Sequence, residues 1–425
     1  MNIAIVGLII MGLTIILFVL DILPSATVAM LGCIAMAAFG VCSVEQIMYG
    51  FSGSIIMLVF GMQLFGEAIF SSGAAALIGN LAVKLSANRE RHFLVISCII
   101  SAVLSAFLTN TAVIIMMIAI CAGVVCSSEN MKMKNLSIPI AVAAIFGGQC
   151  TLVGSTTQLT ASGILQNLTG ESFSIFSLAY FGIPATIFII LFMAFIGYPM
   201  GKRIWEKTED TCEAITASAQ IDFGTYDKKK ILILGGIFLF MMVFFLTGWL
   251  DSGVTAMIAG IACIVSGCVS QKEAFRKIDW NVLIWLSCCL GLGNALNVSG
   301  GSKIIGSALM LLFGPQESAF LLFAVMVLLS MLLSQVMSNM TTILILLPAT
   351  LSMIIPMGLN PYIFTYGMNF GAALTFLTPL ASGHIGFTLT SGYHFKDYLK
   401  YGLIPSICVY LMIIFLCPLF FPLVL

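Results

Sequence analysis

Two short polar clusters interrupt long apolar stretches of this chain. One is the Phe-Leu-Thr-Asn-Thr run at residues 107–111, and the other is the Val-Met-Ser-Asn-Met-Thr run at residues 336–341. Each cluster lies inside an apolar run that is too long for one membrane crossing. Backbone that stops being helical in lipid leaves costly unpaired N–H and C=O groups unless it lines a protein-buried or wet cavity. The paired clusters therefore predict a ligand site at membrane depth, of the kind that transporters use.

The composition also places the chain in a membrane. Hydrophobic residues make up 60% of its 425 residues and charged residues 8%, whereas soluble proteins are roughly a quarter charged. The first apolar run has no basic residue before it and no small-residue cleavage site after it, so we interpret it as a helix and not as a removable signal peptide. No phosphate-binding loop is present, so ATP is not the expected energy source. A nucleic-acid partner is not expected either.

Apolar runs of about 20 residues predict the membrane crossings. Ten such runs lie near residues 3–20, 22–41, 54–72, 137–166, 176–200, 231–250, 252–270, 281–298, 362–392 and 401–424. Two longer runs, 93–127 and 318–356, hold the polar clusters at their middles. We interpret each longer run as a re-entrant hairpin of two half-helices. The expected fold class is an all-α polytopic membrane protein.

Basic residues predict the orientation, because cytoplasmic loops collect Lys and Arg. With the amino terminus outside and both hairpins returning to their side of entry, 16 of the 17 basic residues lie on the cytoplasmic side. Only Lys303 falls outside. Both termini are therefore expected to be extracytoplasmic, in a protein of the plasma (cytoplasmic) membrane.

The chain repeats itself at offsets of 227 to 230 residues. The recurring pairs are Leu20-Asp21 with Leu250-Asp251, Ser72-Gly73 with Ser299-Gly300, Ser105 with Ser334, and Asn110 with Asn339. Each unit holds five crossings and one hairpin, and an odd number of crossings inverts the second unit relative to the first. Such repeats are typical of secondary transporters, whose sites lie near the bilayer midplane. The expected units are 1–200 and 231–425, joined by a cytoplasmic linker at 201–230.

A family resemblance rests on the two clusters and on the loop after the first, which reads Gly147-Gly148-Gln149-Cys150-Thr151-Leu152-Val153-Gly154-Ser155-Thr156-Thr157-Gln158. Together they resemble the divalent anion/sodium symporters of the ion transporter superfamily. In that family a Ser-Asn-Thr signature sits at each hairpin tip, and a Gly-Thr-Pro-Pro-Asn-like loop interrupts the next helix. The resemblance implies a sodium-coupled symporter, not an enzyme, for a small anion such as a dicarboxylate, citrate or sulfate.

The resemblance implies two sodium sites. The first would use Ser105, Thr109, Asn110 and Gly154, with Thr109 in place of the family's Ser. The second would use Ser334, Met337, Asn339 and Ala381, mostly through backbone carbonyls at the last three. Hydroxyl, amide and carbonyl oxygens suit a hard monovalent cation, so sodium is the expected coupling ion.

The resemblance also implies an anion site between the tips, contacted by Asn110, Thr111, Ser155, Asn339, Thr341, Ser382 and His384. Half-helix N-termini hold anions through free N–H groups and the helix dipole, so no Lys or Arg is required. The chain departs from the family where Met340 stands at the Thr position of the second tip. There the hydroxyl moves to Thr341 or is lost.

Two ionisable residues at membrane depth leave an alternative open. His384 lies inside the second loop and is either a structural imidazole or a group that binds substrate or a proton. Glu67, whose repeat counterpart is Asn294, is either a hydrogen-bonded structural acid or a proton carrier. Either residue could serve a proton-coupled anion carrier or a sodium/proton antiporter. The hairpins disfavour an anion channel, and Ser382 and His384 lack the acid that a hydrolase needs.

In the family, the hairpins and broken helices move as an elevator-like body against a scaffold that forms a homodimer. By this resemblance, residues 93–200 and 318–425 would carry the site, and residues 3–72 and 231–298 would form the scaffold. Residues 73–92 would lie along the cytoplasmic interface as a connecting arm.

Overall fold

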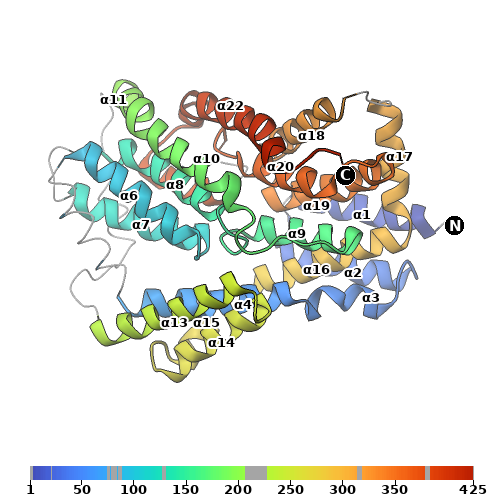
Figure 1. The fold of residues 1–425 in the computed structure, drawn as a ribbon, viewed down its shortest axis with the longest axis horizontal. Helices are drawn as coiled ribbons and strands as arrows, with labels where there is room; N and C mark the ends of the chain where they lie inside the picture. The colour runs from blue at the N-terminus through green and yellow to red at the C-terminus, as the bar shows by residue number, and fades with distance from the viewer. Residues whose placement is uncertain are drawn as a thin grey trace.

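A computed structural model describes residues 3–20, 22–73, 77, 84, 89–126, 131–205, 227–313, 318–378 and 383–424. Most of these residues lie in helices (Figure 1). Most of the expected linker, most of the expected arm and residues 379–382 lie outside the described residues.

The first half begins with α1 (Ile3–Leu20), α2 (Ser25–Ala38), α3 (Val44–Met48), η1 (Tyr49–Ser52) and α4 (Ser54–Ser71). It continues with α6 (Glu90–Ser105), α7 (Asn110–Cys126), α8 (Met133–Gly148), α9 (Thr156–Thr169), α10 (Ala179–Phe192), η2 (Met193–Gly197) and α11 (Tyr198–Trp205). The last three elements follow one another without a break.

The second half begins with α13 (Lys228–Thr247), α14 (Ser252–Val265), α15 (Gln271–Lys277), α16 (Trp280–Val298) and α17 (Gly301–Phe313). It continues with α18 (Ala319–Leu333), α19 (Asn339–Ile354), η3 (Ile355–Met357), α20 (Pro361–Ala373), α21 (Gly383–Gly386), η4 (Phe387–Ser391) and α22 (Phe395–Phe420).

Helix ends recur between the halves at the offset seen in the sequence. Ser43 caps the start of α3 and Ser270 caps the start of α15, each by accepting a hydrogen bond from a first-turn N–H. α4 and α16 both end before a Ser-Gly pair, in which Gly73 has φ 78° and Gly300 has φ 80°. Glycine adopts this left-handed conformation without a steric penalty. The duplication therefore extends from the sequence to the backbone.

The halves also exchange equivalent contacts. α4 packs on α14, and its counterpart α16 packs on α2; α15 contacts α4, and α3 contacts α16. Two matching bundles result, one of α1, α2, α3 and α16 and one of α13, α14, α15 and α4 (Figure 1). A two-fold relation between two copies produces this kind of exchange. The inverted orientation of the copies stays a prediction.

Glu67 and Asn294 take part in this exchange. Lys277 of α15 forms an ion pair with Glu67 of α4 at 2.6 Å. At the repeat-equivalent place, Asn294 Nδ2 of α16 donates a hydrogen bond to the Gln46 carbonyl of α3 at 2.9 Å. Ser71 also donates to Glu67 at 2.9 Å. These contacts support the structural interpretation of Glu67.

The two long runs with polar centres fold as helical hairpins, α6–α7 and α18–α19. Each hairpin packs on the helix that follows it, α8 or α20. Non-helical backbone then follows these helices, at residues 149–155 after α8 and at residues 374–378 after α20. The helical hairpins and the broken helices predicted from the polar clusters are therefore present, and the re-entry of each hairpin stays a prediction.

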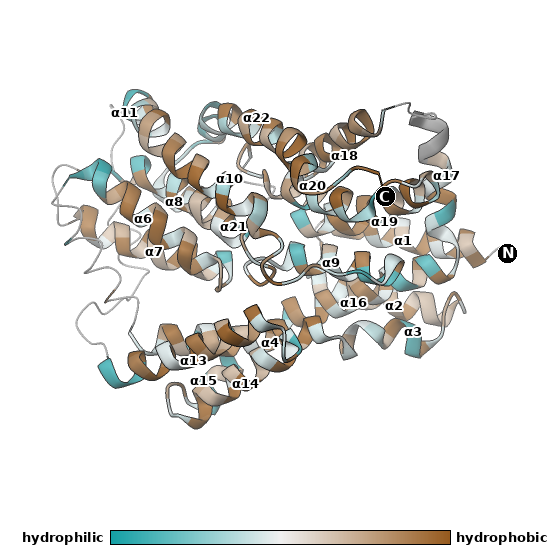
Figure 2. Ribbon diagram, in the orientation of Figure 1, coloured by the Kyte–Doolittle hydropathy of each residue, from teal (hydrophilic) through white to brown (hydrophobic). Residues whose placement is uncertain are grey.

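Six helices of the described chain are long and apolar enough to cross a membrane. They are Val44–Ser71, Ala179–Trp205, Lys228–Thr247, Trp280–Val298, Asn339–Met357 and Phe395–Phe420. α2 and α14 have 14 residues each and rise about 21 Å, which is less than the ~30 Å hydrocarbon core. Figure 2 shows apolar residues along most helices and hydrophilic residues at several of their ends. The all-α polytopic class is confirmed, with some crossings shorter than the apolar runs predicted.

Candidate functional site

Ser105 and Asn110 are in contact at the first hairpin tip. Ser105 ends α6 and Asn110 begins α7. The Ser105 hydroxyl donates a hydrogen bond to Asn110 Oδ1 at 2.5 Å, and both residues are buried. This bond fixes the orientation of the Asn110 amide, with its oxygen toward the end of α6.

The break after α8 closes against this tip through two glycines. A Cβ on Gly148 would lie 2.1 Å from Asn110 Oδ1. A Cβ on Gly154 would lie 2.3 Å from the Gly148 carbonyl oxygen and 2.6 Å from the Ser105 carbonyl oxygen. Only residues without a side chain fit at these positions. Hydroxyl, amide and carbonyl oxygens of Ser105, Asn110 and Gly148 therefore gather at one place.

Gln158 holds the break in this shape. Its Nε2 donates to the carbonyl of Gly148 at 3.0 Å and to the carbonyl of Thr151 at 2.9 Å. The Thr151 hydroxyl donates to the Ala106 carbonyl at the tip. Sequence reasoning assigned no role to Gly148 or Thr151. The Gly147-Gly148 pair was the available signal, because paired glycines mark a close approach of backbones.

The second tip repeats the Ser–Asn relation. The Ser334 hydroxyl lies 3.0 Å from Asn339 Oδ1 and 2.7 Å from the Ala372 carbonyl oxygen of α20. Gln335 Nε2 donates to the Leu374 carbonyl, which ties the tip to the end of α20. Ala372 was missed because a backbone carbonyl leaves no signature in the sequence.

Helix N-termini from opposite halves meet beside this tip. Ser155 caps α9 by accepting from Thr157 N at 3.3 Å, and Ser338 caps α19 by accepting from Thr341 N at 3.2 Å. The Thr156 hydroxyl lies 3.0 Å from Met340 Sδ. The partial positive ends of α9 and α19 therefore share one region.

The helix ends at the tips supply partial positive charge. The sequence holds no Lys or Arg from residue 135 to residue 201 or from residue 304 to residue 395. Helix N-termini bind anions through exposed N–H groups. The region can therefore accept an anion without a basic side chain.

The other predicted residues fall into four groups. Thr111 and Thr341 lie in the first turns of α7 and α19, half-buried and buried respectively. Thr109 is exposed at the first tip, and Met337 is half-buried at the second. Ala381 and Ser382 lie outside the described residues. His384 lies in α21, which packs on α7 and α8. The roles of all these residues stay predictions.

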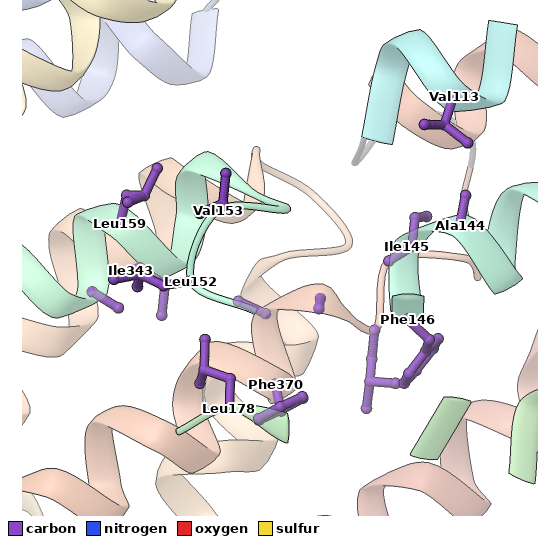
Figure 3. Packing of buried hydrophobic residues seen from close by; sticks show 14 of the residues in the cluster. Val113, Ala144, Ile145, Phe146, Leu152, Val153, Leu159, Leu178, Ile343 and Phe370 are labelled. Carbon is purple, nitrogen blue, oxygen red and sulfur yellow. The ribbon is translucent and has the colours of Figure 1, made fainter. Parts of the chain in front are cut away.

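Apolar side chains surround the polar break. Leu152 and Val153 of the break are buried in one cluster with Leu159 of α9 and Ile343 of α19 (Figure 3). Such surroundings exclude water and strengthen electrostatic contacts with the enclosed oxygens. The break is therefore suited to hold a dehydrated ion.

Glu90 is a buried acid to which sequence reasoning assigned no role. Its carboxylate accepts hydrogen bonds from Lys132 N at 2.9 Å, Asn135 Nδ2 at 3.0 Å and the Tyr198 hydroxyl at 2.7 Å. Lys202 lies 3.8 Å away. These partners satisfy the charge and join α6, α8 and α11. Glu90 therefore stabilises the packing of α6, α8 and α11 around the first hairpin.

A separate cavity of about 240 Å³ lies among η1, α4, α14 and α16. Its lining includes Phe60, Met257 and Trp280, and Ser287 is its one hydroxyl-bearing side chain. It has no charged or amide side chain to bind an anion. The hairpin tips remain the candidate site.

Comparisons with known proteins place the chain in a family of membrane transporters. Residues 15–368 match the family model described as a citrate transporter, CitMHS. An uncharacterized transporter of Haemophilus influenzae is 25% identical over 397 residues, covering 88% of this chain and 83% of that protein. The sodium-dependent dicarboxylate transporter SdcS of Staphylococcus saprophyticus is 21% identical over 396 residues, covering 86% and 76%. Sodium/sulfate cotransporter 1 of Chlamydomonas reinhardtii is 32% identical over 161 residues, covering 35% and 18%.

Two solved structures share the fold. The YdaH transporter of Alcanivorax borkumensis matches with a TM-score of 0.63 at 14% identity, over 89% of this chain and 87% of that chain. MtrF of Neisseria gonorrhoeae matches with a TM-score of 0.63 at 12% identity, over 91% and 84%. The resemblance to divalent anion/sodium symporters and the expectation of a transporter are both confirmed. Because the family model spans most of the chain, the protein belongs to the citrate transporter family and is a multi-pass membrane transporter.

Proposed function

We propose that the protein is a secondary carrier that couples the transport of a small anion to sodium. The anion belongs to the dicarboxylate, citrate or sulfate class. One observation carries the proposal. A buried serine hydroxyl contacts an asparagine amide oxygen at both hairpin tips, in Ser105–Asn110 and in Ser334–Asn339.

The first sodium ion would bind where oxygens of Ser105, Asn110 and Gly148 gather. These ligands are neutral oxygens, so the site would bind a monovalent cation without a buried carboxylate. Gly148, at the end of α8, and Gly154, in the break, have no Cβ, so the break can lie close to the first tip. The second ion would bind at Ser334 and Asn339, together with the predicted Met337 and Ala381.

The anion would bind between the tips, on Asn110, Thr111 and Ser155 of the first half and on Asn339, Thr341, Ser382 and His384 of the second. Helix N-termini supply N–H groups and partial positive charge there. Bound sodium adds full positive charge nearby, so the cations and the anion raise one another's affinity. This mutual dependence is the physical basis of symport.

The activities of two relatives support this assignment. One is a sodium-dependent dicarboxylate transporter and another is a sodium/sulfate cotransporter. A shared sodium dependence with different anions suggests that the cation sites vary less than the anion pocket.

Movement would follow the elevator scheme. Residues 93–200 and 318–425 would move as one body, against a scaffold of residues 3–72 and 231–298 that forms a homodimer. Contacts between α9 and α19 and between α10 and α22 join the two halves of that body. The protein would lie in the cytoplasmic membrane with both termini outside.

The direct binding test is thermal stabilisation of the purified protein. Dicarboxylates, citrate, sulfate and arsenite are added one at a time, with either sodium or choline as the cation. At least one anion should raise the melting temperature in sodium and fail to do so in choline. Equal shifts in the two salts would contradict sodium coupling and favour the proton-coupled alternative.

A further inference from the structure

The two hairpin tips differ at one repeat-equivalent position. At the offset of 229 that pairs Asn110 with Asn339, Thr111 pairs with Met340. A threonine hydroxyl donates a hydrogen bond, whereas a thioether sulfur only accepts weakly. The two tips therefore offer different donors to an anion.

At the second tip, the hydroxyls are already in contact with other groups. Ser338 Oγ lies 2.7 Å from Thr341 Oγ1 and accepts from Thr341 N at 3.2 Å. Thr156, which reaches this tip from α9, has its hydroxyl 3.0 Å from Met340 Sδ. Met340 thus occupies the place where a donor would be needed, and Thr156 closes against it.

At the first tip, the equivalent donors remain open. Within the described residues, the hydroxyls of Thr109 and Thr111 form no hydrogen bond. α21, which begins at Gly383, packs on α7. At the offset of 227 found elsewhere in the repeat, the residue equivalent to Thr156 is Gly383, which carries no side chain.

We propose that the pocket binds a single anionic group, at the first tip, and that Met340 disfavours a second one at the other tip. This inference rests on the proposed sodium-coupled anion carrier. Within the proposed substrate class it favours sulfate over dicarboxylates and citrate, and it adds short monocarboxylates. A second carboxylate beside Met340 would lose hydration without gaining a hydroxyl donor, and an under-paired buried charge is costly. The preferred substrate is a compact anion with one head group, a tetrahedral oxyanion or a short monocarboxylate.

The test compares anion affinities in the full-length protein with sodium present. Sulfate, propionate, succinate and citrate are titrated against the parent, Met340→Thr and Met340→Ser. Met357→Thr is the matched control, because Met357 is a half-buried methionine just beyond the far end of α19. In the parent, sulfate or propionate should bind more tightly than succinate. Either substitution at Met340 should raise the ratio of succinate affinity to sulfate or propionate affinity about tenfold. This is the effect expected for one hydrogen bond to a charged group.

The outcomes separate this inference from the proposed function. Tightest binding of succinate or citrate by the parent would overturn the inference and leave the proposed function standing. The inference would also be overturned if folded Met340 variants showed the same ratio of succinate affinity to sulfate or propionate affinity as the Met357→Thr control. Absence of sodium-dependent binding by any of the four anions would contradict both. A preference for sulfate over propionate identifies the tetrahedral oxyanion, and the reverse preference identifies the monocarboxylate.

Discussion

Asn369 of α20 donates a hydrogen bond from Nδ2 to Gln149 Oε1, at the end of α8, at 3.0 Å. Both side chains are buried, and they come from opposite halves of the chain. The bond links the break beside the first tip to the helix that supports the second tip. It gives a specific reason for the two halves of the site to keep one relative position.

Replacing Asn369 with Leu should therefore destabilise the protein. The buried Gln149 amide would lose its partner, which costs about 1–3 kcal/mol. Thermal unfolding in detergent measures the loss. The double variant Gln149→Leu/Asn369→Leu should lose less stability than the sum of the two single variants, because both polar groups are then removed. An unchanged melting temperature in Asn369→Leu would argue against this link.

Asn110→Ala and Asn339→Ala should each reduce uptake at least tenfold in proteoliposomes. Each asparagine is proposed to bridge a cation and the anion, so its loss removes more than one charge-assisted contact. Uptake of a labelled anion that binds the purified protein measures the effect. Near-normal transport by either variant would remove that tip from the site.

Gly148→Ala should weaken sodium binding about tenfold or more, because the added Cβ would meet Asn110 Oδ1 at 2.1 Å and displace an amide ligand. The control is Gly235→Ala in α13, where a Cβ would meet nothing within 4 Å. Anion binding is measured at increasing sodium concentrations in each variant, which gives the sodium affinity of each. Equal sodium affinities in the two variants would show that the oxygens near Gly148 do not hold sodium.

Glu67→Gln should leave the pH profile of uptake close to that of the parent. The ion pair with Lys277, at 2.6 Å, is partly exposed and contributes little to stability. A structural acid can be replaced by a neutral amide of the same shape, whereas a proton carrier cannot. If Glu67→Gln instead reduced uptake and the remaining uptake no longer varied with pH, the result would support the proton-coupled carrier.

The sequence predicted the tips because the membrane restricts what a chain can do there. Ser105, Asn110, Ser334 and Asn339 are polar residues at the middle of apolar runs, and their constant offset revealed the repeat. Both features survive in the structure as matching hydrogen bonds. The tips and the repeat were therefore predicted from the types of these side chains.

Other parts were not predictable in the same way. The carbonyls of Gly148 and Ala372 belong to the backbone. Every residue type has such a group, so the sequence could not identify these two. The contact of Thr156 with Met340 joins residues 184 positions apart, and only the folded chain brings them together. The short capped helices α3 and α15 were also missed, because a helix of this length presents too few residues to show a period.

The sodium dependence of uptake is the direct test of sodium coupling. The parent protein is reconstituted in proteoliposomes, and initial uptake of a bound anion is measured as sodium replaces choline at constant ionic strength, with and without a protonophore. The two Ser–Asn tips predict uptake that requires sodium, rises with a Hill coefficient above one and persists when the proton gradient is dissipated. Uptake that continues unchanged in choline and collapses with the proton gradient would contradict the account.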